Sequence, residues 1–355
     1  MNDIIIQIGG ICHMNTKRII QTCKDLINTP SVVGYFPAIH QKLEALFHDM
    51  GYEIFVDHKH TAYVHVPGQD ASKTICVGAH LDTIGLIVRH VDENGLLYVR
   101  QLGGINYHSI EGENVYIHTR DGNTYTGMVI CTSHSVHVFD DAKDVARDEN
   151  HMRILLDEDV HSAKEVYDLG IDHGDLVSIE PRFIETTSGY IKSRHIDDKA
   201  CVAAAIEVLH ILKEEHITPS YNTLFAFPIF EEINHGGAYV PSEVQEYVAL
   251  DIGLIGPDYH GSEKTVSIGA SDAFSPYDWG LTTKLKNLAK EQNINAVIDV
   301  YYRYGTDANA AIRAGNNVLA ACFGPGCMNS HGYERCHIQA IEETTKLTLA
   351  YITAK

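Results

Sequence analysis

Four runs of nearly continuous apolar residues constrain the fold of this chain more than any other feature. They read TICVGAH at 74–80, LFAFPIF at 224–230, VALDIGLIG at 248–256 and VLAACFG at 318–324. Strands that are apolar on both faces are typical of parallel sheets with helices on both sides. Helical patterns occur between and around these runs, at about 15–50, 200–213, 307–315 and 338–352. We therefore expect an α/β fold with a mostly parallel sheet flanked by helices.

The middle of the chain has a different sequence pattern. Between about 88 and 185, short β-like stretches alternate with turn signals such as DENG, EGEN and RDGNTYTG. We interpret this segment as a small β-barrel or β-rich domain inserted into the α/β domain, which would comprise 14–87 and 186–355. Residues 1–13 would be an N-terminal extension, unless Met14 is the native start.

Composition narrows the partners and the compartment. The 47 acidic and 27 basic residues give a net charge of −20, which argues against nucleic acids and anionic membranes as partners. The 8 cysteines include no C-x-x-C pair, which argues against a disulfide framework or a thiolate zinc site. There is no apolar run of the roughly 20 residues needed to span a bilayer. We expect a cytoplasmic protein.

Side chains that can bind metals follow the predicted strands, where ligands of open α/β sheets are found. The pattern His-x-Asp occurs four times, and of these only His80/Asp82 directly ends a buried strand. His195/Asp197 lies just ahead of the helix at 200, where Asp197 and Asp198 could equally serve as helix caps. The other two pairs run into turns and are expected at the surface: His90/Asp92 and His173/Asp175.

The pair Glu231-Glu232 is the strongest single signal. It follows the apolar run LFAFPIF directly, and two carboxylates at the buried end of a strand are costly unless they are paired or bound to metal. The other Glu-Glu pairs, Glu214-Glu215 and Glu342-Glu343, fall on predicted helices and are expected to face solvent.

Two further residues complete a candidate set. Asp251 lies inside the run YVALDIGLIG, where its charge needs a salt bridge or a metal, and His331 lies in the turn SHGYERCH, where a satisfied loop histidine is the alternative. The predicted metal ligands are His80, Asp197, Glu232, Asp251 and His331. Carboxylate and imidazole ligands suit zinc first, with cobalt or manganese as alternatives. Two such ions about 3.5–4 Å apart could share Asp197, which leaves Glu231 free as a general base.

In order along the chain, these motifs resemble the TET-type aminopeptidases of metallopeptidase family M42, which include glutamyl, leucyl and lysyl aminopeptidases. The resemblance extends from about Met14 nearly to the end. It rests on GAHLDTIGLIV, GENVYIHTRDGNTYTGMVICTSH, LGIDHGD, HIDDKACVAAA, FEEINHGGA, VALDIG, YGTDANAA and the final histidine turn.

The resemblance implies a two-metal aminopeptidase acting on short peptides. One metal would be held by His80, Asp197 and Asp251, and the other by Asp197, Glu232 and His331. Glu231 would be the general base, and Asp82 would orient His80. The inserted domain would mediate dimerisation within a homo-oligomer, which in this family is often a tetrahedral dodecamer.

The chain also departs from the family pattern. Asn234 and Lys199 stand where the family commonly has Gly and Arg, and SHGYERCH replaces an RYxHS-like sequence. These departures indicate an outlying subgroup and leave two alternatives open: a metal-dependent deacylase or amidase acting on small modified dipeptides, and a non-catalytic assembly protein. It also remains open whether Arg303 or Asp307 shapes the specificity pocket, since Asp307 could instead cap a helix.

Overall fold

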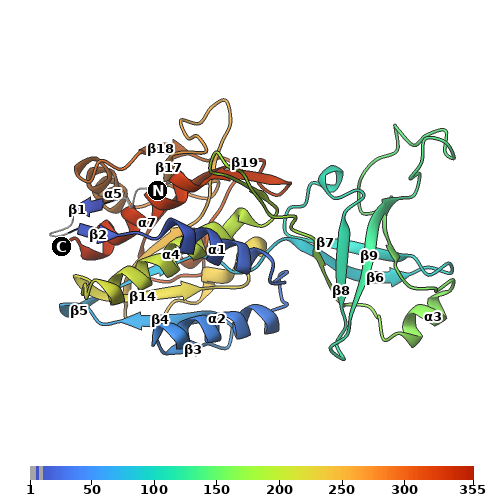
Figure 1. Ribbon diagram of the computed structural model, residues 1–355, viewed down its shortest axis with the longest axis horizontal. Coiled ribbons are helices and arrows are strands. Elements are labelled where there is room, and N and C mark those ends of the chain that lie inside the picture. Colours follow the sequence, from blue (N-terminus) through green and yellow to red (C-terminus); the bar gives the residue numbers. More distant parts are fainter. Residues whose placement is uncertain (1–4, 8–10) are drawn as a thin grey trace.

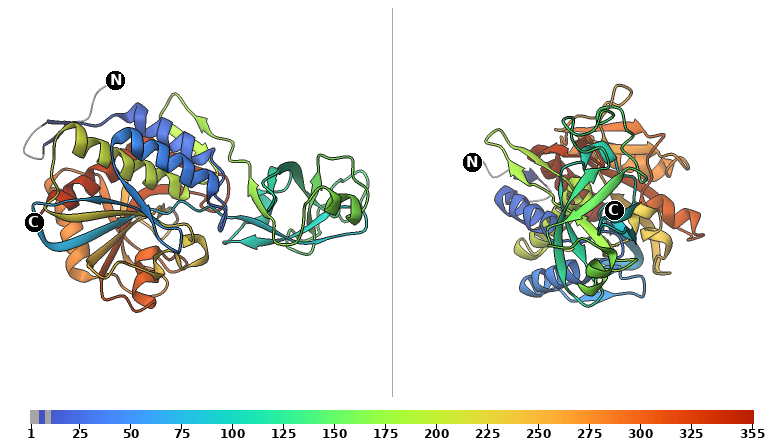
Figure 2. Two further views of the ribbon diagram at one scale, coloured as in Figure 1. Left: turned by 90° about the horizontal axis from the view of Figure 1, so that it is seen from below. Right: turned by 90° about the vertical axis from the view of Figure 1, so that its right-hand side faces the viewer.

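The structure, a computed structural model, describes the backbone of residues 5–7 and 11–355 and the side chains from His13 onward. A large region in which helices cover a sheet, here called the sheet region, contains residues 14–84 and 180–355. A smaller barrel, residues 85–179, projects from one end of it (Figure 1). Figure 2 shows the barrel set to one side of the helices and the sheet. A separate hairpin pairs β1 (Ile5–Gln7) with β2 (Ile11–His13) ahead of Met14.

The sheet region is built on one sheet of twelve strands. These are β3 (Ile54–Val56), β4 (Ala62–Val66), β5 (Asp70–Gly78), β12 (Ile184–Glu185), β13 (Tyr190–Ser193), β14 (Tyr221–Phe227), β15 (Val244–Leu250), β16 (Gly253–Leu254), β17 (Val266–Ser271), β18 (Ala296–Val300), β19 (Leu319–Met328) and β20 (Glu334–His337). The main path runs β12-β13-β20-β19-β15-β5-β14-β4-β3; β16 and β17 join β19, and β18 joins β17. The central strands β19, β15, β5 and β14 are parallel neighbours, and antiparallel strands extend both margins.

Helices cover both faces of this sheet. They are α1 (Thr16–Ile27), α2 (Pro37–Met50), α4 (Ile196–Glu214), α5 (Trp279–Glu291), α6 (Asp307–Arg313) and α7 (Ile338–Thr353). Along β5, Ile75 and Val77 join the core formed with α1, α2, α4, α5 and α7, while Cys76 joins the core under α6. The alternation follows from the period of two along a strand. The predicted mostly parallel sheet with flanking helices is therefore confirmed.

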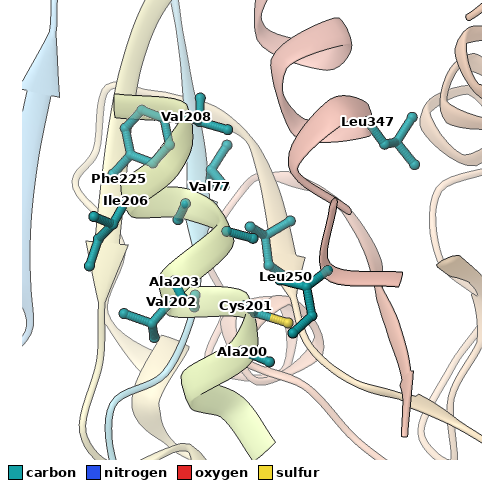
Figure 3. Packing of buried hydrophobic residues seen from close by; sticks show 14 of the residues in the cluster. Val77, Ala200, Cys201, Val202, Ala203, Ile206, Val208, Phe225, Leu250 and Leu347 are labelled. Carbon is teal, nitrogen blue, oxygen red and sulfur yellow. The ribbon is translucent and has the colours of Figure 1, made fainter. Parts of the chain in front are cut away.

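The central helix α4 is apolar on nearly all sides because it is buried between the sheet, α1 and α7. Figure 3 shows side chains of this helix, among them Ala200, Ile206 and Val208, together with Val77, Phe225 and Leu250 of three neighbouring strands. Fully burying a side chain such as Phe225 contributes on the order of 1.5–3 kcal/mol. This packing fixes the start of α4 above the ends of β5, β14 and β15.

Two local features differ from the sequence expectation. Helix α5 was not predicted, because its buried stripe is narrow and consists of Leu281, Thr282, Leu285 and Ala289. The run at 248–256 is not one strand: β15 ends at Leu250, and β16 pairs with a more distant part of β19. The break leaves Asp251 between two strands rather than within one.

The barrel closes in the order β10-β7-β6-β11-β8-β9, and every neighbouring pair is antiparallel. Its elements are β6 (Gly85–Val91), β7 (Leu97–Leu102), β8 (Asn114–His118), β9 (Thr124–Cys131), β10 (Met152–Leu156), α3 (Ala163–Asp168) and β11 (Leu176–Ile179), with a short 3-10 turn η1 (Tyr107–Ser109). Strand β6 begins at Gly85, slightly ahead of the turn signals that suggested residue 88. The domain boundaries and the separate status of residues 1–13 stay predictions, and residues 1–4 and 8–10 lie outside the described chain.

Within the described residues, no helix has both the length and the apolar character required to cross a bilayer.

Candidate metal centre

The predicted ligands converge at the carboxyl ends of the central parallel strands. His80 follows β5, Glu231 and Glu232 follow β14 in the 3-10 turn η2 (Glu231–Ile233), and Asp251 directly follows β15. These three strands are neighbours, so their carboxyl ends meet at one edge of the sheet. Asp197 reaches the same edge from the start of α4.

Asp197 lies between two histidines. Its Oδ1 atom is 3.2 Å from Nε2 of His80, and its Oδ2 atom is 3.6 Å from Nε2 of His331. On the His331 side of Asp197, Nε2 of His331 is also 3.3 Å from Oε2 of Glu232. The sequence hypothesis required one carboxylate within reach of both histidines, and the geometry meets this requirement.

Asp251 and Glu231 lie on the His80 side. In the group His80, Glu231 and Asp251, the candidate ligand atoms all lie within 4.8 Å of one another, and the same holds for Asp197, Asp198 and Asp251. Glu231 Oε2 is 3.7 Å from Nε2 of His80. The fold thus gathers all five predicted ligands and Glu231 around one centre.

The start of α4 has an irregular backbone. His195 adopts φ 65°, Asp197 and Asp198 have non-helical φ and ψ values, and a cis peptide bond joins the two aspartates. Within the described chain, neither carboxylate makes a capping hydrogen bond to the helix, so the capping interpretation of the pair is wrong, although both residues do lie in the first turn of the helix. Asp198 is fully buried; its Oδ2 accepts from the backbone N–H of His80 at 3.2 Å, while Oδ1 has no partner among the described residues.

Asp82 is fully buried below the same edge. Its Oδ1 accepts the backbone N–H of Glu231 at 3.1 Å and its Oδ2 that of Glu232 at 3.0 Å. His80 Nδ1 is 3.1 Å from the main-chain oxygen of Asp82 and 3.5 Å from its carboxylate. Asp82 therefore contacts three residues of the centre through both its backbone and its side chain.

Burial sets the electrostatics of the centre. Burial is the main cause that raises the pKa of Glu231, Glu232 and Asp251 well above their ordinary values, and neighbouring carboxylates add to it. Burial lowers the pKa of His80, but hydrogen bonds with Asp197 and Asp82 outweigh it and raise that pKa well above its ordinary value. So many carboxylates in a low-dielectric site need cations to remain ionised together.

The donor set fits divalent cations. It offers imidazole nitrogens and carboxylate oxygens without a thiolate, and such donors suit zinc, cobalt or manganese. Lys199 lies close enough to Asp82 and Asp198 to interact with their charges. It is fully buried and donates to Ser31 Oγ at 2.7 Å and to the carbonyl of Leu81. Burial lowers the pKa of Lys199 to about 7, so this lysine is a weak counter-charge for the carboxylates.

A cavity of about 490 Å³ opens onto the centre. Its lining includes Arg303, Phe274 and Asn234, together with Gly104 from the barrel. Asp307 is not part of the lining; its Oδ1 accepts the backbone N–H of Gly237 at 2.6 Å. Of the two specificity candidates, Arg303 is thus the one that reaches the cavity, whereas Asp307 supports the loop that carries Glu231.

Several carboxylates outside the centre are placed differently from expectation. Glu342 and Glu343 are buried rather than solvated, because Glu342 accepts from Thr16 and Glu343 pairs with Lys346 at 2.8 Å. Asp175, expected at the surface, is buried in the barrel. His90 and His173 are exposed on the barrel as expected.

Comparison with known proteins agrees with this geometry. The family model described as M42 glutamyl aminopeptidase matches residues 61–347. YhfE of Bacillus subtilis, which carries an aminopeptidase assignment, is 38% identical over 95% of this chain and 98% of its own length.

Two solved structures share the fold. An aminopeptidase from the archaeon Desulfurococcus kamchatkensis superposes with a TM-score of 0.85 at 20% identity over 96% of both chains. The TET1 peptidase of Pyrococcus horikoshii superposes with a TM-score of 0.81 at 24% identity over 95% of this chain and 100% of its own. Because the family model spans most of the sequence and a relative matches almost its full length, the chain belongs to the M42 family of glutamyl aminopeptidases and is a peptide hydrolase.

Proposed function

We propose that this protein is a two-metal aminopeptidase that removes N-terminal residues from short peptides. The observation that carries the proposal is the position of Asp197, with one oxygen 3.2 Å from His80 and the other 3.6 Å from His331. His80, Asp197 and Asp251 would hold one cation, and Asp197, Glu232 and His331 the other. When bound, two such cations polarise a scissile carbonyl and lower the pKa of a nucleophilic water.

Glu231 is the general base in this proposal. It is adjacent to the ligand Glu232, yet its own carboxylate stands 3.7 Å from His80 on the side of the cavity. Glu231 would take a proton from the attacking water and deliver it to the leaving amine nitrogen as the C–N bond breaks. A carboxylate whose pKa is raised by burial is suited to hold that proton between the two steps.

Asp82 and the cavity set the remaining geometry. Asp82 would orient His80 and hold the backbone of Glu231 and Glu232 through its two oxygens. The cavity of about 490 Å³ has room for a short peptide end. Among the described residues, Arg303 is the one lysine or arginine in its lining, so acidic groups on the substrate would be favoured there.

We also propose a homo-oligomer in which the barrel mediates dimerisation. The TET1 peptidase of Pyrococcus horikoshii can assemble into a tetrahedron or a large octahedral shell. In this chain the loop after β9 exposes Val136 and Val138 at 59% and 69%, and exposed apolar side chains on a protruding domain favour self-association. Sedimentation of the purified protein tests this point; a monomer at micromolar concentration would contradict it.

The activity is tested with an aminoacyl substrate panel on protein loaded with Zn²⁺, Co²⁺ or Mn²⁺. We expect release of N-terminal residues with at least one metal, and no release from any substrate would overturn the proposal. The deacylase or amidase alternative is motivated by two family departures whose residues line the cavity: Asn234 and the turn SHGYERCH, through Ser330 and His331. Comparing free and acetylated N-termini on one peptide separates the two, and we expect the free amine to be preferred.

A further inference from the structure

Glu334 joins two predicted ligands that come from distant parts of the chain. Its side chain is buried, with 2% of the residue exposed. Its Oε2 accepts the backbone N–H of Asp197 at 3.2 Å, and its Oε1 accepts the backbone N–H of His331 at 3.1 Å. Both oxygens are therefore occupied by the main chain of ligand residues, and Glu334 acts on the centre through their backbone.

The sheet fixes Glu334 in this position. In the antiparallel pair β13 and β20, Glu334 is the partner of Ser193, which is four residues before Asp197. The strand that leads into Asp197 and the strand that follows His331 are thus paired. One carboxylate at their junction can set the distance between the two ligands.

The two segments need such support because their backbones are not regular. His331 has φ 62°, the left-handed region, which costs a residue with a side chain about 1–2 kcal/mol. Asp197 has a non-helical ψ of 107° at the start of a helix. Hydrogen bonds from a buried carboxylate to these two N–H groups satisfy donors that the irregular backbone leaves without a regular partner.

The arrangement matches that of Asp82, which also uses both carboxylate oxygens for backbone N–H groups of the centre. These N–H groups belong to Glu231 and Glu232. The two carboxylates support different segments: Asp82 supports the loop after β14, whereas Glu334 supports the start of α4 and the turn after β19.

We propose that Glu334 is a positioning residue that controls cation affinity mainly at the position formed by Asp197, Glu232 and His331. This inference rests on the proposed two-metal function. Glu334 contacts two of the three residues at that position and one of the three at the other. His80 and Asp251 come from the middle of the sheet, at the ends of β5 and β15. Among the described residues, neither makes a hydrogen bond or ion pair with β20 that would transmit a change.

The test measures Co²⁺ binding to the full-length metal-free protein by visible absorption and calorimetry. Glu334→Gln keeps the size of the side chain but loses one of the two acceptors, and Glu334→Ala loses both. We expect affinity at one of two positions to fall about 10- to 100-fold, more for Ala than for Gln, while the other changes less than about threefold. His331→Ala and His80→Ala identify which binding phase belongs to which position.

Arg335→Gln is the matched control. Arg335 is the next residue of β20, half exposed, and pairs with Glu263 away from the centre, so its substitution is expected to leave both affinities unchanged. Thermal melting confirms that each variant folds. If Glu334→Ala does not fold, the near-isosteric Glu334→Gln still decides the test.

Two outcomes would overturn the inference, and they are distinguishable. If the wild-type protein binds two Co²⁺ ions and the Glu334 variants lose both equally or neither, this inference alone fails. If the wild-type protein binds fewer than two ions, the two-metal proposal fails and the inference with it.

Discussion

The sheet region buries several carboxylates within a few ångströms of one another, whereas the barrel core is built from apolar side chains contributed by all six of its strands. In the first region, residues such as Asp82 and Asp198 are fully buried at strand and helix ends, where their charge opposes folding. In the second, residues such as Val99 and Ile117 are buried at no such cost. The comparison indicates that the chemistry is concentrated at the sheet edge, whereas the barrel has an apolar core of its own.

The barrel nevertheless reaches the centre at one point. Gly104, in the loop after β7, lines the cavity, and its carbonyl oxygen is 2.8 Å from Nδ1 of His331. The neighbouring Gly103 lies close to Glu232, because a Cβ added there would be 3.4 Å from Oε2. The two regions are therefore distinct in composition but share the orientation of one ligand.

The largest effect that we expect is on turnover, from Glu231→Gln. Loss of a general base typically lowers the rate by about 10²- to 10⁴-fold, while cation content measured by elemental analysis should stay close to that of the wild type. Glu158→Gln, a substitution of an exposed barrel carboxylate, is the control and should keep full activity. Unchanged turnover in Glu231→Gln would show that the base is another residue.

Cation loading should stabilise the sheet region more than the barrel. Removing divalent ions with a chelator leaves the buried carboxylates without counter-charge, and restoring Zn²⁺ at 100 times its dissociation constant should add about 2.7 kcal/mol per cation position to the free energy of unfolding. Hydrogen exchange should show the gain at the ends of β5, β14 and β15, with little change in β7 to β9. Equal gains in both regions would contradict this expectation and show that the barrel is stabilised together with the sheet region.

Much of the fold was predictable because burial leaves a direct mark on sequence. The apolar runs correspond to β5, β14, β15 and β19, and dense turn signals marked the barrel. Helix α5 was missed because only a narrow stripe of it is buried. Glu342 and Glu343 were expected to face solvent because the sequence pattern does not show their partners. Thr16 reaches Glu342 only through tertiary packing, and Lys346 pairs with Glu343 on the same helix.

The residues of the candidate centre were predictable to about the same extent as the fold. His80 and Glu232 were recognisable since each follows an apolar run, and Asp251 because its charge lies inside such a run. Glu334 and Asp198 were missed as contributors because their role depends on backbone N–H groups of distant segments. The one sequence signal for Glu334 was its position three residues after the candidate ligand His331, within SHGYERCH. Without knowledge that β13 pairs with β20, this glutamate cannot be distinguished from a surface residue.

Substitution of Gly103 should produce a smaller effect that tests the contact between the two regions. Gly103 has φ +78°, and a Cβ there would be 2.6 Å from Cγ2 of Ile84. Gly103→Ala should destabilise the protein by about 1–2 kcal/mol and lower activity several-fold, because the loop that holds His331 must shift. Gly122→Ala, at φ +90° in a barrel turn with open space around it, carries the backbone cost alone, so a similar loss of activity there would refute the explanation.

The last effect concerns another junction of the two regions, where His118 of β8 stacks on Tyr35 of the sheet region with ring centroids 4.2 Å apart. His118 Nε2 is 2.8 Å from Ser178 Oγ, and burial lowers the pKa of His118 to about 4 from its ordinary 6.5. Between these values the unfolded chain binds a proton that the folded chain does not. His118 therefore opposes stability increasingly as the pH falls from 6.5 towards 4, and not above 6.5.

Urea unfolding of the chelator-treated protein at several pH values between 7 and 4.5 measures this dependence without a contribution from cation release. We expect His118→Gln to lose less stability on acidification than the wild type, because glutamine does not titrate. His137→Gln, a change of an exposed histidine in a barrel loop, should leave the slope unchanged. If His118→Gln and the wild type have the same slope, the proton is not taken up at this junction, and the barrel would then be joined to the sheet region without the pH sensitivity that buried His118 implies.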